Sequence, residues 1–390
     1  MLYGSMEPNE RFRARRAQAR RRRRIRRALV AGALLVLVLS LVGGWQFRPA
    51  HKNAAARAAE ATVIVTPSHA VRPRPLPVEV RGVHVTGPLA SLPGKLAEYA
   101  ALRSQGLNTI VLDVKDESGE VGFVPAGVPL ARTIGATRPF YDPRAVARML
   151  HRHGIYLVGR IVVFQDSVLA RARPDLAVQR AGGGAWTTSS GFGWLDPYDR
   201  RAWSYAVGIA KAAARAGFDE IMFDYVRFPS DGDIAHAVYP ARTSESRGHV
   251  IGDFAQYAVA RLRPLGVRVS TALFGLSATQ DLGVGQVPRW VSRYVDTVSP
   301  MAYPVLYTSG ELGLADPSSE PGETVFRTLA DFHQQMRGSA AHLVPWIQDW
   351  GYDLAQVRAQ IDAARLQGAK GYLLWNAEGL YTPGALAPPP

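Results

Sequence analysis

The sequence alternates between short apolar segments and longer helical segments, and this alternation constrains the fold more than any other feature. Eight apolar segments have strand character, at 78–85, 109–114, 156–164, 220–226, 267–274, 297–303, 343–347 and 371–375. Helical segments separate them, among others at 143–153, 201–216, 254–262, 323–336 and 355–366. Eight alternating units of this size are typical of a (β/α)₈ TIM barrel, and a doubly wound open sheet is the alternative.

Glycine marks the passage from helix to strand in six of these units. The six residues are Gly106, Gly154, Gly217, Gly266, Gly338 and Gly368. A helix that ends in a left-handed residue favours glycine at that position, because glycine has no Cβ to clash. The sequence therefore predicts short turns between each helix and the following strand.

The connections that follow several strands are much longer, at 115–141, 165–198, 227–250 and 304–322. In a TIM barrel these connections lie at the C-terminal ends of the strands, where active sites are built. We therefore expect the functional side chains to lie at the strand ends.

The segment 218–229, with the sequence FDEIMFDYVRFP, contains the first candidate for chemistry. Side chains alternate along a strand, so Glu220, Met222 and Asp224 share one face. A carboxylate at the end of a buried strand is costly unless it is paired or used. Asp224 is therefore predicted to be catalytic.

Seven motifs follow one another along the chain: RGVHVTG, NTIVLDVKDESGEVGF, GRIVVFQD, FDEIMFDYVRFP, VSPMAYP, VPWIQDW and GYLLWNAEGLY. Together they resemble the TIM-barrel glycoside hydrolase family that was once catalogued as a domain of unknown function. The resemblance covers essentially all of residues 79–382, and FDEIMFDYVRFP is its most specific part. It implies a barrel related to polysaccharide-cleaving enzymes, and it leaves the catalytic residues to be assigned from their chemistry.

Glycosidic cleavage usually needs two carboxyl groups that flank the scissile bond. Asp113 on the second strand is the predicted partner of Asp224, and Lys115 shares its face of the strand. Asp349, after the seventh strand, is the competing second carboxylate. Less favoured are Asp116, Asp166 and Glu378.

We expect the substrate to contact basic, amide and aromatic side chains at the strand ends, namely Lys115, Arg160, Arg227, Tyr303, Trp375 and Asn376. Further aromatic candidates are Trp186, Trp194, Trp346 and Trp350. Structural alternatives exist for several of these residues. The alternative ion pairs are Asp113 with Lys115, Asp224 with Arg227 and Glu220 with Arg160, and Asp349 could instead cap the helix that begins near Tyr352.

The N-terminal segment predicts attachment to a membrane. Residues 1–27 contain eleven arginines and carry +9 of the formal net charge of +14. Residues 28–45 have no charge, and as a helix they would span roughly 27 Å, close to the ~30 Å hydrocarbon core. The arginines predict a cytoplasmic N terminus with the barrel outside. A cleaved signal peptide is the alternative, and it would also export the barrel.

Residues 46–78 are rich in Ala, Arg and Pro and are expected to form a semi-rigid linker before a barrel at 79–382. Residues 383–390 are expected to form a disordered tail. The chain outside the basic segment 1–27 carries only +5, so a nucleic-acid partner is not expected.

The residue types exclude several other chemistries. The chain contains no cysteine, which excludes disulfides, thiolate metal sites and a cysteine nucleophile. It has no GxSxG or HExxH motif and no glycine-rich phosphate loop after a strand, so no metal or cofactor is expected. The sequence therefore predicts a membrane-anchored glycoside hydrolase outside the cytoplasm, with a cell-wall or surface polysaccharide as substrate. The alternative is an inactive glycan-binding barrel of the cell envelope.

Overall fold

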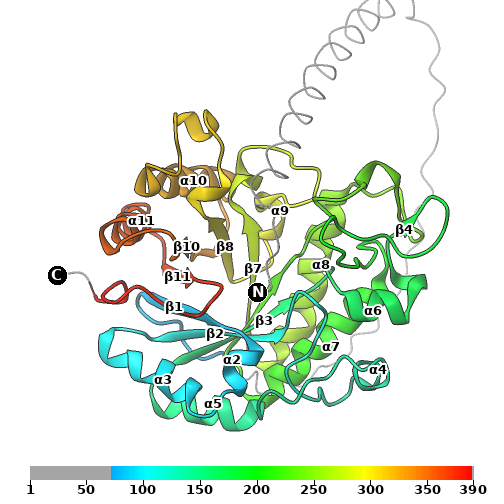
Figure 1. Ribbon diagram of the computed structural model, residues 1–390, viewed down its shortest axis with the longest axis horizontal. Helices are drawn as coiled ribbons and strands as arrows, with labels where there is room; N and C mark the ends of the chain where they lie inside the picture. The colour runs from blue at the N-terminus through cyan, green and yellow to red at the C-terminus, as the bar shows by residue number, and fades with distance from the viewer. Residues whose placement is uncertain (1–71, 389–390) are drawn as a thin grey trace, which may run out of the picture. The chain divides into compact units, whose positions relative to one another are not determined.

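The computed structural model describes residues 72–388, and their central feature is a closed barrel of eight parallel strands (Figure 1). The barrel strands are β1 (Val80–Val85), β2 (Thr109–Lys115), β3 (Tyr156–Val162), β5 (Glu220–Asp224), β7 (Arg268–Phe274), β8 (Thr297–Ala302), β10 (Trp346–Gln348) and β11 (Gly371–Trp375). The short strand β9 (His342–Leu343) precedes β10 and also pairs with β8. The barrel closes because β10 pairs with both β8 and β11, and β11 pairs with β1. This closure excludes the open-sheet alternative.

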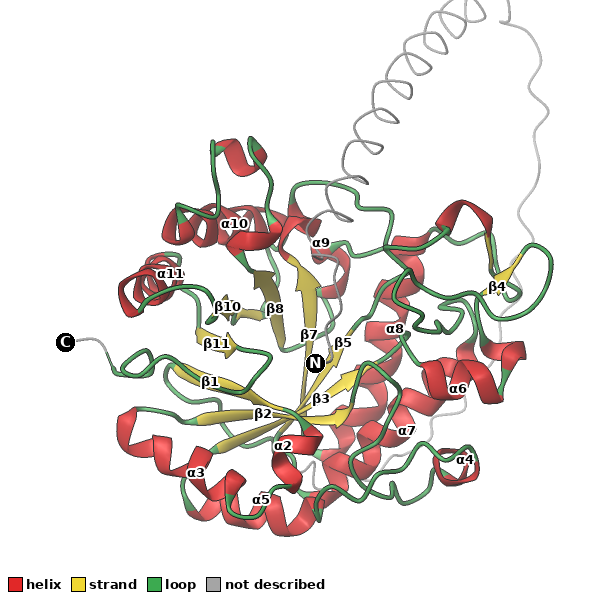
Figure 2. Cartoon of the chain, in the orientation of Figure 1, coloured by secondary structure: helices red, strands yellow, loops and turns green. Residues whose placement is uncertain are grey.

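Helices surround the barrel and cover its outer face (Figure 2). They are α2 (Gly87–Ser91), α3 (Lys95–Ala101), α4 (Pro129–Thr133), α5 (Pro143–Arg152), α6 (Ser167–Ala172), α7 (Arg200–Ala216), α8 (Arg247–Leu262), α9 (Pro288–Val291), α10 (Pro321–Gln335) and α11 (Leu354–Leu366). Side-chain caps fix the start of the longer helices: Asp142 begins α5, Asp199 begins α7, Ser246 begins α8 and Asp353 begins α11. The largest apolar cluster lies between these helices and the strands.

The six glycines that the sequence places between helix and strand all have left-handed backbone conformations. Their φ angles lie between 67° at Gly368 and 111° at Gly106. Any other residue would be strained there, which explains why glycine marks these junctions.

Two long connections, those after β3 and β5, are joined at their tips. The short strands β4 (Gln179–Arg180) and β6 (Ala237–Val238) pair antiparallel as a second, two-stranded sheet. Both connections leave C-terminal strand ends, so this ribbon belongs to the face that the sequence predicts to carry the active site.

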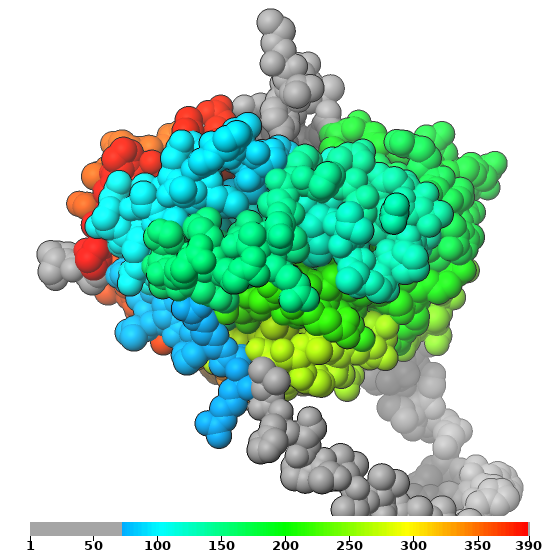
Figure 3. All heavy atoms as spheres, turned by 90° about the horizontal axis from the view of Figure 1, so that it is seen from below, coloured from blue at the N-terminus to red at the C-terminus, as the bar shows by residue number. Residues whose placement is uncertain are grey.

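The barrel interior has an apolar middle and polar ends. Alternate side chains of each strand point inward, and Val111, Val158, Met222, Ala272 and Leu373 fill the centre. The floor of the barrel is the N-terminal end of the strands. There Glu220 accepts a hydrogen bond from Tyr156, and Leu76 lines the same small cavity. In the space-filling view the first described residues, in blue, lie beside yellow-green residues at the lower edge of the molecule (Figure 3).

The fold extends past both predicted domain boundaries. Leu76, in the predicted linker, packs against the interior apolar cluster. At the other end Ala385 and Leu386 are buried, and the hydroxyl of Tyr372 donates to the carbonyl of Ala385 at 2.9 Å. The prediction of a disordered tail is therefore wrong for residues 383–388, because two apolar side chains there complete the outer core.

The predicted membrane span at 28–45 lies outside the described residues. Within residues 72–388, the helices are too short or too polar to cross a bilayer.

Candidate active site

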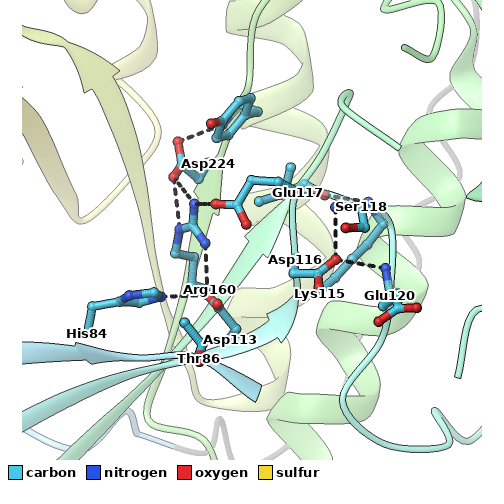
Figure 4. Close-up of polar contacts among 12 residues, drawn as sticks. His84, Thr86, Asp113, Lys115, Asp116, Glu117, Ser118, Glu120, Arg160 and Asp224 are labelled. Atoms are coloured by element: carbon cyan, nitrogen blue, oxygen red, sulfur yellow. Dashed lines mark hydrogen bonds and ion pairs between the residues drawn. The ribbon is translucent and has the colours of Figure 1, made fainter. Parts of the chain in front are cut away.

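A cluster of charged side chains occupies the mouth of the barrel, at the C-terminal ends of β2, β3 and β5. The strand register brings it together, since Asp113 pairs with Arg160 and Val162 pairs with Asp224. Arg160 therefore enters the interior beside Asp113 and extends toward the end of β5. Figure 4 shows its guanidinium between three carboxylates, with His84 on the far side of Asp113.

Arg160 forms ion pairs with all three carboxylates. Its Nη1 donates to Oδ1 of Asp113 at 2.8 Å. Its Nε and Nη2 lie 2.9 Å and 2.8 Å from Oδ2 of Asp224, and Nη2 also donates to Oε1 of Glu117. Arg160 is 1% exposed, so these pairs lie in a region largely shielded from water. One cation thus holds three acidic groups at a single point of the mouth.

The electrostatics of the cluster follow from this geometry. Burial acts to raise the pKa of Asp113, but the charges of His84 and Arg160 bring that pKa below its usual value. Burial acts in the opposite direction on Arg160, yet Glu117, Asp113 and Asp224 raise its pKa well above the ordinary value. Asp113 is therefore held as a carboxylate and Arg160 as a cation.

An aromatic wall stands beside the cluster. Nε2 of His84 lies 2.9 Å from Oδ1 of Asp113, and the imidazole stacks on Trp375 with ring centroids 4.2 Å apart. Trp346 meets Trp375 edge-on at 5.5 Å, and the guanidinium carbon of Arg160 lies 5.2 Å from the Trp375 ring. Trp375 is thus at the mouth as predicted, with one face already covered by His84.

Two tyrosines complete the surroundings of Asp224. The backbone N–H of Tyr225 donates to Oδ1 of Asp224 at 2.7 Å. Tyr225 has a φ of 50°, a left-handed conformation that costs a non-glycine residue about 1–2 kcal/mol. Burial, followed by the charge of Asp224, raises the pKa of Tyr303 well above its ordinary value. Tyr303 also packs against Trp350, with ring centroids 5.2 Å apart.

Lys115 lies outside this cluster, contrary to the prediction. The register between β2 and β3 shifts between Asp113 and Lys115, so the two residues do not keep the simple alternation that the sequence suggests. Nζ of Lys115 lies 2.9 Å from Oδ2 of Asp166 and donates to the carbonyl of Val162 at 2.7 Å. The side chain is fully buried, so it has no surface for a substrate, and its partner is not Asp113.

Asp349 holds the C-terminal segment rather than the cluster. Its Oδ2 accepts the backbone N–H of Thr382 at 2.9 Å, and its Oδ1 accepts the Thr382 hydroxyl. Asn376 donates to the carbonyl of Asp349 at 2.6 Å, which ties the ends of β10 and β11 together. The prediction that Asp349 caps the next helix is also wrong, because Asp353 occupies that position.

The other predicted ion pairs do not form. Asp224 pairs with Arg160 rather than Arg227. Glu220 accepts a hydrogen bond from the hydroxyl of Tyr156 at 3.1 Å. It lies at the floor of the barrel, at the opposite end of β5 from Asp224, and does not pair with Arg160. Arg227 instead lies among the rings of Trp194, Tyr225 and Phe274.

Glu117 is the residue that the sequence analysis missed. It lies two residues beyond the end of β2, and its side chain is 32% exposed, against 4% for Asp113 and 6% for Asp224. The motif DVKDE contains the signal, because a carboxylate this close to a strand end is a candidate for the mouth. Asp116, its neighbour, instead accepts the backbone N–H groups of Ser118 and Glu120, both at 2.9 Å.

The comparison with protein families decides the classification. A family model described as "Putative glycosyl hydrolase domain" matches residues 82–381. The chain belongs to this family. The match includes all the residues of the mouth cluster and all of the barrel except the first two residues of β1, and it confirms the resemblance that the sequence motifs indicate. No curated protein matches the chain.

Solved structures agree with the family's fold. The PgaB (BpsB) glycoside hydrolase domain from Bordetella bronchiseptica has a TM-score of 0.57 at 17% identity, over 78% of this chain and 95% of that one. The catalytic domain of β-amylase from Paenibacillus polymyxa has a TM-score of 0.51 at 12% identity, over 80% and 96%. A hypothetical protein from Ruminiclostridium thermocellum is 35% identical over 48% of this chain and 96% of its own, with a TM-score of 0.44. The first two share the barrel fold with the family.

Proposed function

We propose that this family member is an extracytoplasmic glycoside hydrolase, anchored by residues 28–45, that cleaves a cell-wall or surface polysaccharide. The observation that carries the proposal is the convergence of Asp113, Glu117 and Asp224 on Arg160 beside the aromatic wall. Glycosidic cleavage requires one carboxyl group to protonate the leaving oxygen and a second to attack the sugar or activate water.

Asp224 is the proposed ionised carboxylate of the pair. Arg160 compensates its negative charge, and the N–H of Tyr225 fixes the orientation of its other oxygen. Such contacts fix the position of this carboxylate opposite a positive charge that develops on the sugar. The strained backbone at Tyr225 supports this role, because strain of this kind concentrates at functional sites.

Glu117 is the proposed proton donor, a role that requires its side chain to leave Arg160 and take up a proton when the substrate binds. Its side chain is the most exposed of the three, so it can approach a glycosidic oxygen that binds above Arg160. Asp113 is less suited to donate a proton, because His84 and Arg160 bring its pKa below the usual value. Asp113 is instead a positioning residue that orients Arg160 and His84.

Hydrolysis assays on a panel of polysaccharides and aryl glycosides test these roles. We expect Glu117→Gln to lose roughly 10²–10⁴-fold in kcat on glycans, the usual range for general acid catalysis. The same variant should retain activity on dinitrophenyl glycosides, whose leaving group needs no proton. Asp224→Asn should lose activity on both substrates.

Two outcomes would contradict the assignment. Wild-type activity in Asp224→Asn would remove Asp224 from the mechanism. Retention of glycans by the wild-type protein without any turnover would instead establish the inactive glycan-binding barrel.

The proposed location rests on the uncharged segment 28–45 and the eleven arginines that precede it. Cell fractionation of the full chain and of a chain that begins at residue 46 tests it. We expect the full chain in the membrane fraction, accessible to protease from outside, and the shortened chain in the cytoplasm. An accessible barrel released into the medium would indicate a cleaved signal peptide.

A further inference from the structure

Arg227 differs from the other buried basic side chains of residues 72–388. Three lysine or arginine residues are buried there, Lys115, Arg160 and Arg227. Lys115 pairs with Asp166, and Arg160 pairs with three carboxylates. Arg227 is 6% exposed, yet none of the carboxylates in the described chain forms an ion pair with it. A buried charge without such a partner destabilises the folded protein, which suggests that Arg227 has a function in binding.

Protein contacts satisfy only part of the guanidinium. Its central carbon lies 4.7 Å from the ring centroid of Trp194, 4.8 Å from Tyr225 and 4.7 Å from Phe274. Its Nη1 donates to Oγ of Ser230 at 3.1 Å and to the carbonyl of Phe228 at 3.3 Å. Burial lowers the pKa of Arg227, although nearby charges oppose this shift. The aromatic rings therefore stabilise the cation without neutralising it.

The remaining edge of the guanidinium is free. Within the described residues, Nε and Nη2 of Arg227 have no hydrogen-bond acceptor, and neither atom is sealed from solvent. These two N–H groups are parallel and coplanar, the arrangement that binds both oxygens of a carboxylate.

The free edge belongs to the same mouth as the carboxylate cluster. Arg227 follows the end of β5, and Phe274 is the last residue of β7, the next strand of the barrel. The ring of Tyr225 connects the two sites: it contacts Arg227, and burial, followed by the charges of Glu117 and Asp224, raises its pKa. A sugar bound next to the cleaved bond would therefore lie within reach of Arg227.

We propose that Arg227 binds the carboxylate of a uronic acid residue, through Nε and Nη2, and so selects an acidic polysaccharide as substrate. This inference rests on the proposed function, since it names the substrate class of that site. The bound carboxylate supplies the charge that the protein does not, and the aromatic rings of Trp194 and Phe274 exclude water around the pair.

Binding to the Asp224→Asn protein tests the proposal without requiring turnover. The probes are alginate, polygalacturonate and hyaluronan, each compared with its carboxyl-reduced counterpart by affinity electrophoresis and calorimetry. We expect at least one acidic polymer to bind, and its reduced form to bind roughly 10- to 100-fold more weakly, as for a hydrogen-bonded charge pair.

Arg247 provides a matched control, because its guanidinium also lies over two rings, those of Phe228 and Tyr239 at 4.9 Å and 5.3 Å. Adding Arg227→Gln should abolish the preference for the acidic polymer, whereas adding Arg247→Gln should preserve it. The comparison of acidic and reduced polymers uses intact Arg227, so it holds even if Arg227→Gln fails to fold.

Equal binding of acidic and reduced polymers would overturn the proposal, as would binding of none of the acidic polymers. Equal losses in Arg227→Gln and Arg247→Gln would also overturn it. If the wild-type protein hydrolyses a neutral glycan through Asp224 and shows no preference for carboxylates, the proposed function stands and only the uronate site is rejected.

Discussion

The two ends of strand β5 each have a buried carboxyl group, but the two groups have different partners. Taken as whole residues, Glu220 at the floor is 3% exposed and Asp224 at the mouth is 4% exposed, and both point into the barrel. Asp224 has Arg160 and a backbone N–H as partners. Glu220 has the hydroxyl of Tyr156, and none of the basic side chains in residues 72–388 forms an ion pair with it. Burial accordingly raises the pKa of Glu220 to about 7.

This difference teaches that a buried carboxylate on a strand is not by itself a sign of catalysis. The compensating cation distinguishes the two positions. At the mouth, Arg160 allows charged carboxylates to remain buried, where they are available for catalysis. At the floor, Glu220 is neutral below about pH 7 and packs among apolar side chains.

The largest effect on stability should follow from removing the cation of the mouth. Arg160→Met leaves three carboxylates without their common partner, and we expect it to lower the free energy of unfolding by about 3–5 kcal/mol. Urea denaturation measures this loss. Adding Asp113→Asn and Asp224→Asn should restore part of it, because those changes remove the uncompensated charges. Arg173→Met, whose side chain is 40% exposed and pairs with a 48% exposed Asp175, should stay within about 0.5 kcal/mol of wild type.

The floor should show a smaller effect with a distinctive pH dependence. Glu220 has a raised pKa in the folded protein, so folding favours its protonated form and the wild-type protein loses stability between pH 4.5 and about 7. Glu220→Gln removes this loss. We expect the variant to gain at most about 3 kcal/mol over wild type above pH 7, and little below pH 4.5. Thermal unfolding across this pH range measures the difference. A constant difference between the two proteins at all pH values would show that Glu220 does not titrate in this way.

Asp113 should produce the opposite dependence. Its pKa in the folded protein lies below the ordinary value, so its contribution to stability is present above about pH 4 and disappears as the pH falls through the lowered value. Asp113→Asn should therefore be less stable than wild type at neutral pH, and the difference in stability should shrink as the pH falls below about 4.

The smallest effect should come from a buried carboxylate that lies near the mouth outside the cluster. Thr382→Ala removes the hydroxyl hydrogen bond to Asp349 and keeps the one from the Thr382 backbone N–H, and we expect a loss of about 1–2 kcal/mol in stability with no change in hydrolysis. The activity of Thr382→Val serves as the control for side-chain size. A loss of activity without a loss of stability in Thr382→Ala would return Asp349 to the catalytic candidates.

The sequence predicts the strands and helices of the barrel because the patterns that identify them are local. Apolar strands, amphipathic helices and a left-handed glycine at a helix end depend on neighbouring residues, so Gly106 and Gly217 can be recognised without the fold. The position of Asp224 follows in the same way, since alternation along β5 and its place at the strand end are both local.

The partners in the cluster depend on contacts between strands, which one sequence does not show. Arg160 reaches Asp224 because β3 and β5 pair in a particular register. The register shift after Asp113 turns Lys115 away from the interior, and regular alternation cannot foresee it. Glu117 lies in a loop, where no period fixes the direction of a side chain. Leu386 is assigned to the wrong segment because composition near the C terminus says nothing about the apolar surface that receives it.

The most direct test of the difference between the two ends of β5 is the rate of glycan hydrolysis by Asp224→Asn and Glu220→Gln, measured side by side. Both changes replace a carboxylate by its isosteric amide on the same strand. We expect the mouth variant to lose activity by at least roughly 100-fold, and the floor variant to stay within about twofold of wild type. Equal losses in the two variants, or a loss only in Glu220→Gln, would contradict the assignment of catalysis to the cluster around Arg160.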